Sequence, residues 1–184
     1  GLVTSNERSF YWRLTGRQNL RFFAELYQVP IGEAEPRIAE FLEALDLVEF
    51  ADRRFDGYST GIRQRFAFAR SLLHRPRILF MDEPTKGLDP NASLSLLQLI
   101  RQRILQVWQP TIIITSHNLT EIEALCDRVA IIDRGRLLRI GTIAELARSI
   151  RGYEGYAIEL AGASESLLAG LRALLGPGRV RLRA

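Results

Sequence analysis

Two adjacent carboxylates end an apolar run in the stretch LFMDEPTKGLDP, residues 79–90. Asp82 and Glu83 would repel each other, so their adjacency needs a reason, and a divalent cation and a phosphate nearby would supply one. Mg²⁺ prefers oxygen ligands, so Asp82 is a candidate ligand for that ion, directly or through water. Glu83 is then a candidate base that orients and deprotonates water attacking a phosphate. Taken alone, the pair is also explained by a strand end that faces solvent.

A histidine follows a second apolar run. His117 comes two residues after TIIIT, residues 111–115. If this run and 78–82 are neighbouring parallel strands, their carboxyl ends meet at one edge of a sheet, which is where ligands bind. The imidazole would then lie beside Glu83 as a hydrogen-bond donor. Without such a neighbour, a lone histidine is more simply a structural residue.

The segments that must position these residues alternate between strand and helix. The runs 78–82 and 111–115 are apolar enough to be buried on both faces, as in a parallel sheet. Strands are also expected at 1–5 and 128–133, and a turn at 134–135 extends the latter into a hairpin. This alternation predicts an α/β fold with right-handed crossovers.

Capping residues mark where the helices begin. Thr15 and Gln18 have the spacing of a capping box, and Ser59 is a good N-cap for a later helix. Apolar residues at helical spacing follow both positions. Further helices are expected around 38–45 and over 91–108 and 119–126.

The composition is that of a soluble globular protein. A chain of 184 residues with 47% hydrophobic and 25% charged residues suits one domain with the start of another. The net charge of +4 is spread along the chain, which indicates a solvated surface, so no nucleic-acid partner is expected. The single cysteine, Cys126, excludes an internal disulfide and fits a reducing compartment. No apolar run approaches the roughly 20 residues needed to cross a bilayer.

The composition changes near the end of the chain. After residue 150, patterns of strand, helix and strand are separated by glycine-rich turns. We therefore predict a main domain over 1–148 and the start of a small α+β accessory domain over 149–184.

Four motifs stand in a characteristic order. They are YSTGIRQR (58–65), RILFMDEP (77–84), TKGLDP (85–90) and ITSHN (114–118). In that order they resemble the signature, the Walker B strand with its catalytic glutamate, the D-loop and the switch histidine of ATP-binding cassette (ABC) transporter nucleotide-binding domains. The resemblance covers about residues 1–148. It implies a partial P-loop NTPase-like parallel sheet with a helical subdomain, and ATP and Mg²⁺ as the cofactors.

The resemblance assigns roles around the subunit's own nucleotide. Glu83 and His117 correspond to the catalytic residues, and Asp82 corresponds to the Mg²⁺ ligand. Residues 1–14 look like the Q-loop region, where Asn6 stands in place of the usual glutamine. Asn6 keeps the carboxamide with a shorter reach and is the second candidate for the metal, although a plain loop asparagine explains it equally.

Three further residues correspond to those that serve the nucleotide of a second subunit. Ser59 and Gly61 lie at the start of the signature helix, and Asp89 lies in the D-loop. A helix amino end with free N–H groups favours anions such as a γ-phosphate. Thr60 and Ile62 depart from the common LSGGQ pattern, and the serine and second glycine remain. An ordinary serine-capped helix is the simpler explanation of this segment by itself.

The phosphate-binding Walker A pattern, G-x-x-x-x-G-K-[S/T], is absent from this sequence. The only lysine is Lys86, between Thr85 and Gly87, and it cannot complete that pattern. We therefore expect a truncated chain that is inactive by itself, from a parent protein that hydrolyses ATP.

The family's partners are a transmembrane permease subunit and a second nucleotide-binding subunit. The expected location is cytoplasmic, peripheral at the inner face of the cell membrane, and the expected role is that of an exporter subunit. The helices of 15–50, together with Tyr11 and Trp12, would form the helical subdomain that docks on the permease. Core packing explains most of the apolar residues there equally well. Two alternatives stay open: a soluble ABC ATPase acting on DNA or ribosomes, and a non-catalytic module that donates its signature to a partner.

Overall fold

The computed structural model of the chain describes residues 1–4, 9–150 and 170. The strands are β1 (Leu2–Thr4), β2 (Ile78–Asp82), β3 (Thr111–Thr115), β4 (Val129–Asp133) and β5 (Arg136–Gly141). The α-helices are α1 (Gly16–Leu26), α2 (Ile31–Ala44), α3 (Thr60–Leu72), α4 (Pro90–Leu99), α5 (Leu119–Leu125) and α6 (Ile143–Ile150). Short 3₁₀ turns lie at Val48–Phe50 and Phe55–Gly57, and the π-helix η4 (Ile100–Leu105) continues α4. The chain divides into two units, Gly1–Leu146 and Ala147–Ala184.

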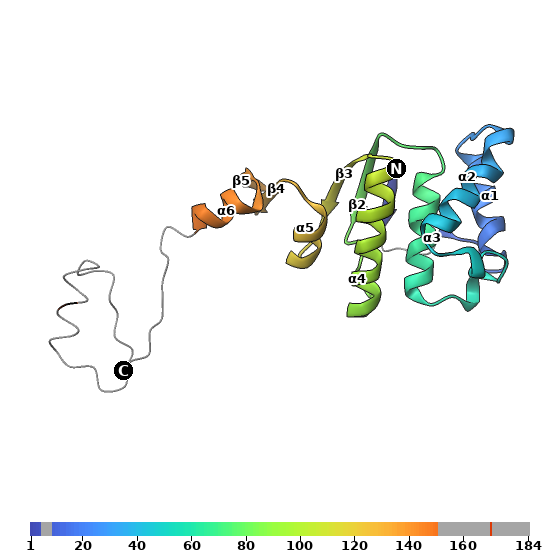
Figure 1. The fold of residues 1–184 in the computed structure, drawn as a ribbon, viewed down its shortest axis with the longest axis horizontal. Helices are drawn as coiled ribbons and strands as arrows, with labels where there is room; N and C mark the ends of the chain where they lie inside the picture. The colour runs from blue at the N-terminus through green and yellow to red at the C-terminus, as the bar shows by residue number, and fades with distance from the viewer. Residues whose placement is uncertain (5–8, 151–169, 171–184) are drawn as a thin grey trace. The chain divides into compact units, whose positions relative to one another are not determined.

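Three strands form a parallel sheet in the order β1, β2, β3. The register places Leu2 beside Phe80 and Phe80 beside Ile113. Helix α3 contacts β1. Three other helices, α1, α2 and α4, contact α3 (Figure 1). The predicted α/β class and the parallel pairing of 78–82 with 111–115 are therefore confirmed.

The prediction that β2 is buried on both faces is wrong. Leu79 and Met81 are buried in one core with residues of α3 and α4. Ile78 and Phe80 point the other way and remain 46% and 47% exposed, and Ile113 of β3 is 48% exposed. Successive strand residues point to opposite faces, and the described helices cover only one of them. Apolar residues on both faces show that a strand can be buried on both sides. Whether both sides are buried depends on the segments that pack against it.

The helix starts agree with the capping residues in the sequence. The Thr15 hydroxyl accepts from the Gln18 amide at 3.2 Å, and the Gln18 side chain accepts from the Thr15 amide at 2.9 Å. The Ser59 hydroxyl accepts from the Ile62 amide at 3.4 Å at the start of α3. Both predicted caps are confirmed. Each satisfies amide donors that have no partner inside the helix.

Aromatic side chains pack beneath the amino end of α3. Phe66 is fully buried, with its ring stacked on Tyr58 at 5.1 Å and edge-on to Phe55 at 5.9 Å. Gly16 allows this packing, because a Cβ there would lie 2.3 Å from the Phe66 ring. The Gly16 amide also donates to the Tyr58 hydroxyl at 3.2 Å. The cluster therefore ties the start of α1 to the residue that precedes Ser59.

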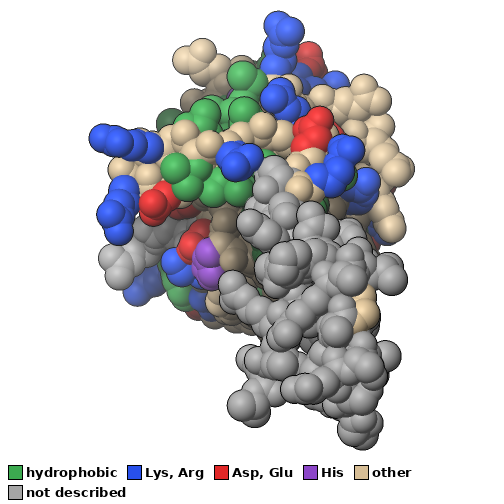
Figure 2. All heavy atoms as spheres, turned by 90° about the vertical axis from the view of Figure 1, so that its left-hand side faces the viewer, with side chains coloured by type: hydrophobic (Ala, Val, Ile, Leu, Met, Phe, Trp, Pro, Cys, Tyr) green, Lys and Arg blue, Asp and Glu red, His purple; other side chains and the backbone are tan. Residues whose placement is uncertain are grey.

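The predicted hairpin is confirmed as β4 and β5, which pair antiparallel through a two-residue turn. Arg134 and Gly135 have φ of +47° and +75° in that turn, the backbone that suits the twist of a tight hairpin. Within the described residues the hairpin pairs only with itself. Its apolar side chains Ile132 and Leu137 are exposed. Figure 2 shows hydrophobic side chains lying among basic side chains on one face of the molecule.

The end of the chain lies almost wholly outside the described residues. The predicted accessory domain over 149–184 falls there and stays a prediction. Among the helices that the structure does describe, none combines the length and the apolarity needed to cross a membrane.

Candidate functional site

Glu83 occupies the corner where β2 ends. Its backbone has φ of +45°, in the left-handed region that non-glycine residues rarely adopt. Its amide donates to the carbonyl of Thr115, the last residue of β3, at 3.0 Å. The amide of Lys86 in turn donates to the Glu83 carbonyl at 3.0 Å, which closes a tight turn. This backbone fixes the carboxylate at the carboxyl edge of the parallel sheet.

The structure brings His117 to Glu83. The imidazole Nδ1 lies 2.8 Å from Glu83 Oε1. The ring remains 80% exposed and the Glu83 side chain 26% exposed, so both face solvent at the sheet edge. An ionised carboxylate only accepts hydrogen bonds, so Nδ1 is the donor. The expectation that these two side chains meet is confirmed.

Lys86 is a second partner of Glu83. Its Nζ forms an ion pair with Glu83 Oε2, three residues before it in the chain. The Lys86 hydrogen bond is the main reason that the pKa of Glu83 is lowered from its usual value, and the His117 hydrogen bond is the next. The same contact raises the pKa of Lys86. Glu83 is therefore held in its ionised form, as a base must be.

Replacing Lys86 by methionine should raise the pKa of Glu83 toward its ordinary value of 4.5. The lysine favours the ionised carboxylate, so the carboxyl of the variant will keep its proton to a higher pH. A ¹³C NMR titration of the glutamate carboxyls measures this, with Glu83 assigned from the Glu83→Gln spectrum. Lys86→Arg keeps the positive charge and should preserve most of the lowering. An unchanged Glu83 titration in Lys86→Met would contradict the assignment of the ion pair.

Asp82 is the residue that fits a metal. Its carboxylate lies at the end of β2 and is exposed, and Oδ1 accepts from the Thr115 hydroxyl at 2.5 Å. These oxygens are of the kind that Mg²⁺ prefers. Among the described residues, no group of three or more Asp, Glu, His or Cys side chains could hold a metal ion. Asn6, the other predicted metal residue, lies outside the described residues.

A cavity of about 570 Å³ opens beside this edge. Glu83, Lys86 and His117 line it together with residues of the following turn, α4 and α5. Two of its lining residues, Thr85 and Glu121, are buried, and the Thr85 hydroxyl donates to Glu121 Oε1. The cavity therefore joins the predicted catalytic pair to a buried polar contact.

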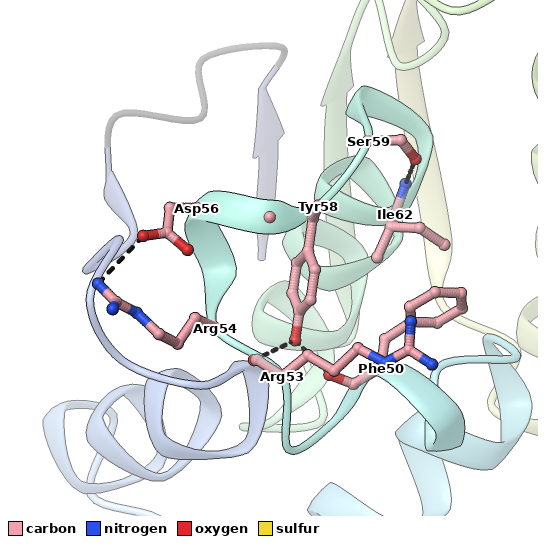
Figure 3. A pocket seen from close by; sticks show the side chains of 8 residues that line it. Phe50, Arg53, Arg54, Asp56, Tyr58, Ser59 and Ile62 are labelled. Atoms are coloured by element: carbon pink, nitrogen blue, oxygen red, sulfur yellow. Dashed lines mark hydrogen bonds and ion pairs between the residues drawn. The ribbon is translucent and has the colours of Figure 1, made fainter.

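Ser59 lines a different cavity, of about 630 Å³. Figure 3 shows the Ser59 hydroxyl turned toward the Ile62 amide, and the Tyr58 ring pointing away toward Arg53. The Tyr58 hydroxyl donates to the Arg53 carbonyl at 2.8 Å. Arg54 and Asp56, which also line this cavity, form an ion pair at 3.1 Å. The predicted signature residues are thus separate from the Glu83 and His117 pair.

Asp89 and Gly61 lie at two neighbouring helix starts. Asp89 caps α4, with its Oδ1 accepting from the Ala92 amide at 2.9 Å. A Cβ on Gly61 would meet only the Ala92 Cβ, at 3.7 Å, which is ordinary contact. Glycine inside a helix costs about 0.5–1 kcal/mol relative to alanine. The packing of the described residues gives no reason for that cost at Gly61.

Sequence reasoning missed three residues of the candidate site. Lys86 was not expected to pair with Glu83, although a spacing of three residues in a tight turn allows it. Thr85 and Glu121 were not expected at all. The sequence signal at Glu121 points to a different role. Asn118 and Glu121 have capping-box spacing, which predicts that the Glu121 side chain caps α5. Asn118 does cap α5 through the Thr120 amide at 3.0 Å, while Glu121 turns to Thr85.

Comparison with known proteins shows what the chain is similar to. The family described as ABC transporter matches residues 1–86. The linearmycin resistance ATP-binding protein LnrL of Bacillus subtilis is 36% identical over 172 residues, which are 94% of this chain and 55% of that protein. A fluoroquinolones export ATP-binding protein of Mycobacterium tuberculosis is 41% identical over 143 residues, which are 77% of this chain and 46% of that protein. The chain thus spans about half the length of these relatives.

A solved structure supports the same fold. The structure of cbiO1 from Clostridium perfringens, part of the ABC transporter complex cbiONQ, matches with a TM-score of 0.72. It is 24% identical, and the match covers 97% of this chain and 64% of that one. The parallel sheet, the order of the motifs and the edge that joins Glu83 to His117 are those of a nucleotide-binding domain. Over most of its length the chain is therefore similar to ATP-binding proteins of ABC transporters.

Proposed function

We propose that the chain is part of an ATP-hydrolysing subunit that energises an ABC exporter. The contact between Glu83 and His117, 2.8 Å apart at the ends of β2 and β3, carries this proposal. It places a base held in its ionised form beside an imidazole, at the edge where α/β sheets bind ligands. The names of the relatives, which refer to antibiotic resistance and drug export, support the exporter role.

The chemistry follows from what each side chain can do. Glu83 accepts a proton from water while the water oxygen attacks the γ-phosphorus of ATP, and the bond from that phosphorus to its bridging oxygen breaks. His117 orients Glu83 through Nδ1 at the edge of the cavity that both residues line. Asp82, with Asn6 as a second candidate, would hold Mg²⁺, which neutralises charge on the phosphates.

A second nucleotide-binding subunit would complete the site. Ser59 and Gly61 stand at the exposed start of α3, and Asp89 stands at the start of α4. The glycine at position 61 has no packing role within the described residues. A closely approaching phosphate or backbone of another subunit would account for it. We therefore infer a dimer in which these three residues serve the nucleotide of the partner.

A transmembrane permease subunit is the second proposed partner. Tyr11 and Trp12 remain 51% and 41% exposed beside the helices of residues 15–50. Arg63 of α3 lies over the Trp12 ring, 4.4 Å from its centroid. Exposed aromatic residues of this kind are enriched at protein interfaces. Such a subunit would be cytoplasmic and held at the inner face of the cell membrane through the permease.

The 184-residue chain by itself should release no phosphate from ATP, whereas the full-length subunit should do so with Mg²⁺. The reason is that the chain lacks the Walker A lysine and amide cradle that bind the β- and γ-phosphates. A phosphate-release assay on both proteins measures this. Turnover by the 184-residue chain that Glu83→Gln abolishes would contradict the prediction. A full-length subunit without Mg²⁺-dependent turnover would contradict the proposed function.

A further inference from the structure

Thr85 and Glu121 form a buried polar contact next to the catalytic edge. Glu121 is 3% exposed and Thr85 is 6% exposed, although a carboxylate is rarely buried so deeply. We propose that Glu121 is a positioning residue, which acts through Thr85 to hold Glu83 and His117 at hydrogen-bonding distance. The proposal rests on the proposed function for its catalytic consequence.

The contact closes a ring of residues around the catalytic pair. Thr85 follows Glu83 by two residues, in the turn that the Lys86 and Leu88 amides stabilise at 3.0 and 3.1 Å. Glu121 follows His117 by four residues, in the first turn of α5. One side-chain contact joins Thr85 to Glu121. The other joins His117 to Glu83 at 2.8 Å. Two attachments fix the relative position of the two loops better than one exposed hydrogen bond does.

Glu121 is poorly satisfied for a buried acid. The Oε1 atom of Glu121 accepts from Thr85, while Oε2 is buried without a partner among the described residues. A buried carboxylate with an unpartnered oxygen lowers the stability of the folded chain. Replacing such a group by an apolar residue of similar volume often leaves the stability unchanged or raises it. A leucine at position 121 would pack the same space beside α4. The acid is therefore better explained by directing Thr85 than by filling the core.

The exposed His117 ring gives a readout that does not need nucleotide. Nδ1 carries the hydrogen when it faces the Glu83 carboxylate, whereas a free histidine ring favours hydrogen on Nε2. The ¹⁵N shifts of the ring nitrogens distinguish these tautomers at a pH where the ring is neutral. His74 is the other histidine of the chain and its ring contacts Tyr27, so it serves as an internal reference.

Thr85→Val should move the His117 ring shifts most of the way from the parental values to those of Glu83→Ala, in which the contact is absent. Thr85→Ser keeps the hydroxyl and should retain the parental shifts. Thr120→Val changes an exposed threonine of the same cavity and serves as the matched control. If Thr85→Val leaves the ring shifts at the parental values, or if Thr120→Val moves them equally, the positioning role is wrong.

A second variant separates positioning from loss of folding. Thr85→Val/Glu121→Leu removes both polar groups and leaves no buried charge, so it should fold at least as well as Thr85→Val. We expect it to show the same displaced ring shifts, and parental shifts in this variant would overturn the proposal. In the full-length subunit, Thr85→Val should lower kcat about 10-fold to 100-fold with a smaller change in KM. Because the ring shifts are measured without ATP, an inactive full-length subunit would contradict the proposed function and leave the ring test intact.

Discussion

A full-length subunit that carries Glu83→Gln should hydrolyse ATP about 100-fold to 10,000-fold more slowly than the parental protein. This is the usual loss of rate when a positioned base is removed. Glutamine has the shape of glutamate and still accepts a hydrogen bond from His117 Nδ1, but it cannot take the proton of the attacking water. Binding of ATP should persist. The amide of glutamine has the same shape as the carboxylate, so the substitution should not weaken the contacts that hold ATP before the reaction. Phosphate release and equilibrium binding of ATP measure the two effects separately.

Glu123→Gln is the matched control for this substitution. Glu123 lies on α5, two residues after Glu121, and its side chain is exposed. It loses the same charge at a position that does not touch the cavity, so hydrolysis should stay at the parental rate. Parental turnover in Glu83→Gln would show that another residue acts as the base. Equal losses in both variants would point to net charge instead of the position of the carboxylate.

Phe66→Ala should lower the free energy of unfolding of the 184-residue chain by about 3–5 kcal/mol, the usual range for a buried phenylalanine. Phe66 is fully buried on α3. Its ring is stacked on Tyr58, with the planes 10° apart. Alanine would leave a cavity among rings that also hold the amino end of α1, and neighbouring rings can relax into it only in part. Urea denaturation followed by circular dichroism measures the change.

Phe22→Ala provides the comparison for the Phe66 substitution. Phe22 is on α1 and remains 37% exposed, although its ring contacts Phe23 and Tyr11. The same change of side chain should therefore destabilise the chain much less there. Similar losses for the two variants would mean that the aromatic cluster beneath α3 is not a packed core.

Local signals in the sequence were sufficient to predict the helices and strands and part of the candidate site. Ser59 and Thr15 are capping residues whose effect is confined to one turn, so the helix starts could be predicted from a few letters. The meeting of Glu83 with His117 could be predicted because parallel strands that are neighbours in a sheet must end at the same edge. These inferences depend on geometry that holds for any α/β sheet.

Contacts between distant segments could not be predicted in the same way. Thr85 and Glu121 are 36 positions apart, and nothing in either segment distinguishes a buried threonine or glutamate from an exposed one. The exposure of Ile78 and Phe80 on one side of β2 could not be predicted for the same reason. Strand composition shows which faces can be buried, whereas coverage depends on segments elsewhere in the chain.

At Glu83, the backbone conformation that the fold requires favours glycine, whereas the proposed chemistry requires a carboxylate. Other non-glycine residues with positive φ, such as Gln28 and Asp46, stand directly after helices, where that conformation commonly ends a helix. Glu83, with φ of +45°, follows a strand instead. Glycine would adopt the same backbone with about 1–2 kcal/mol less strain, but it carries no carboxylate. A glycine at this position would therefore make the turn more stable and would remove the carboxylate that we propose as the base.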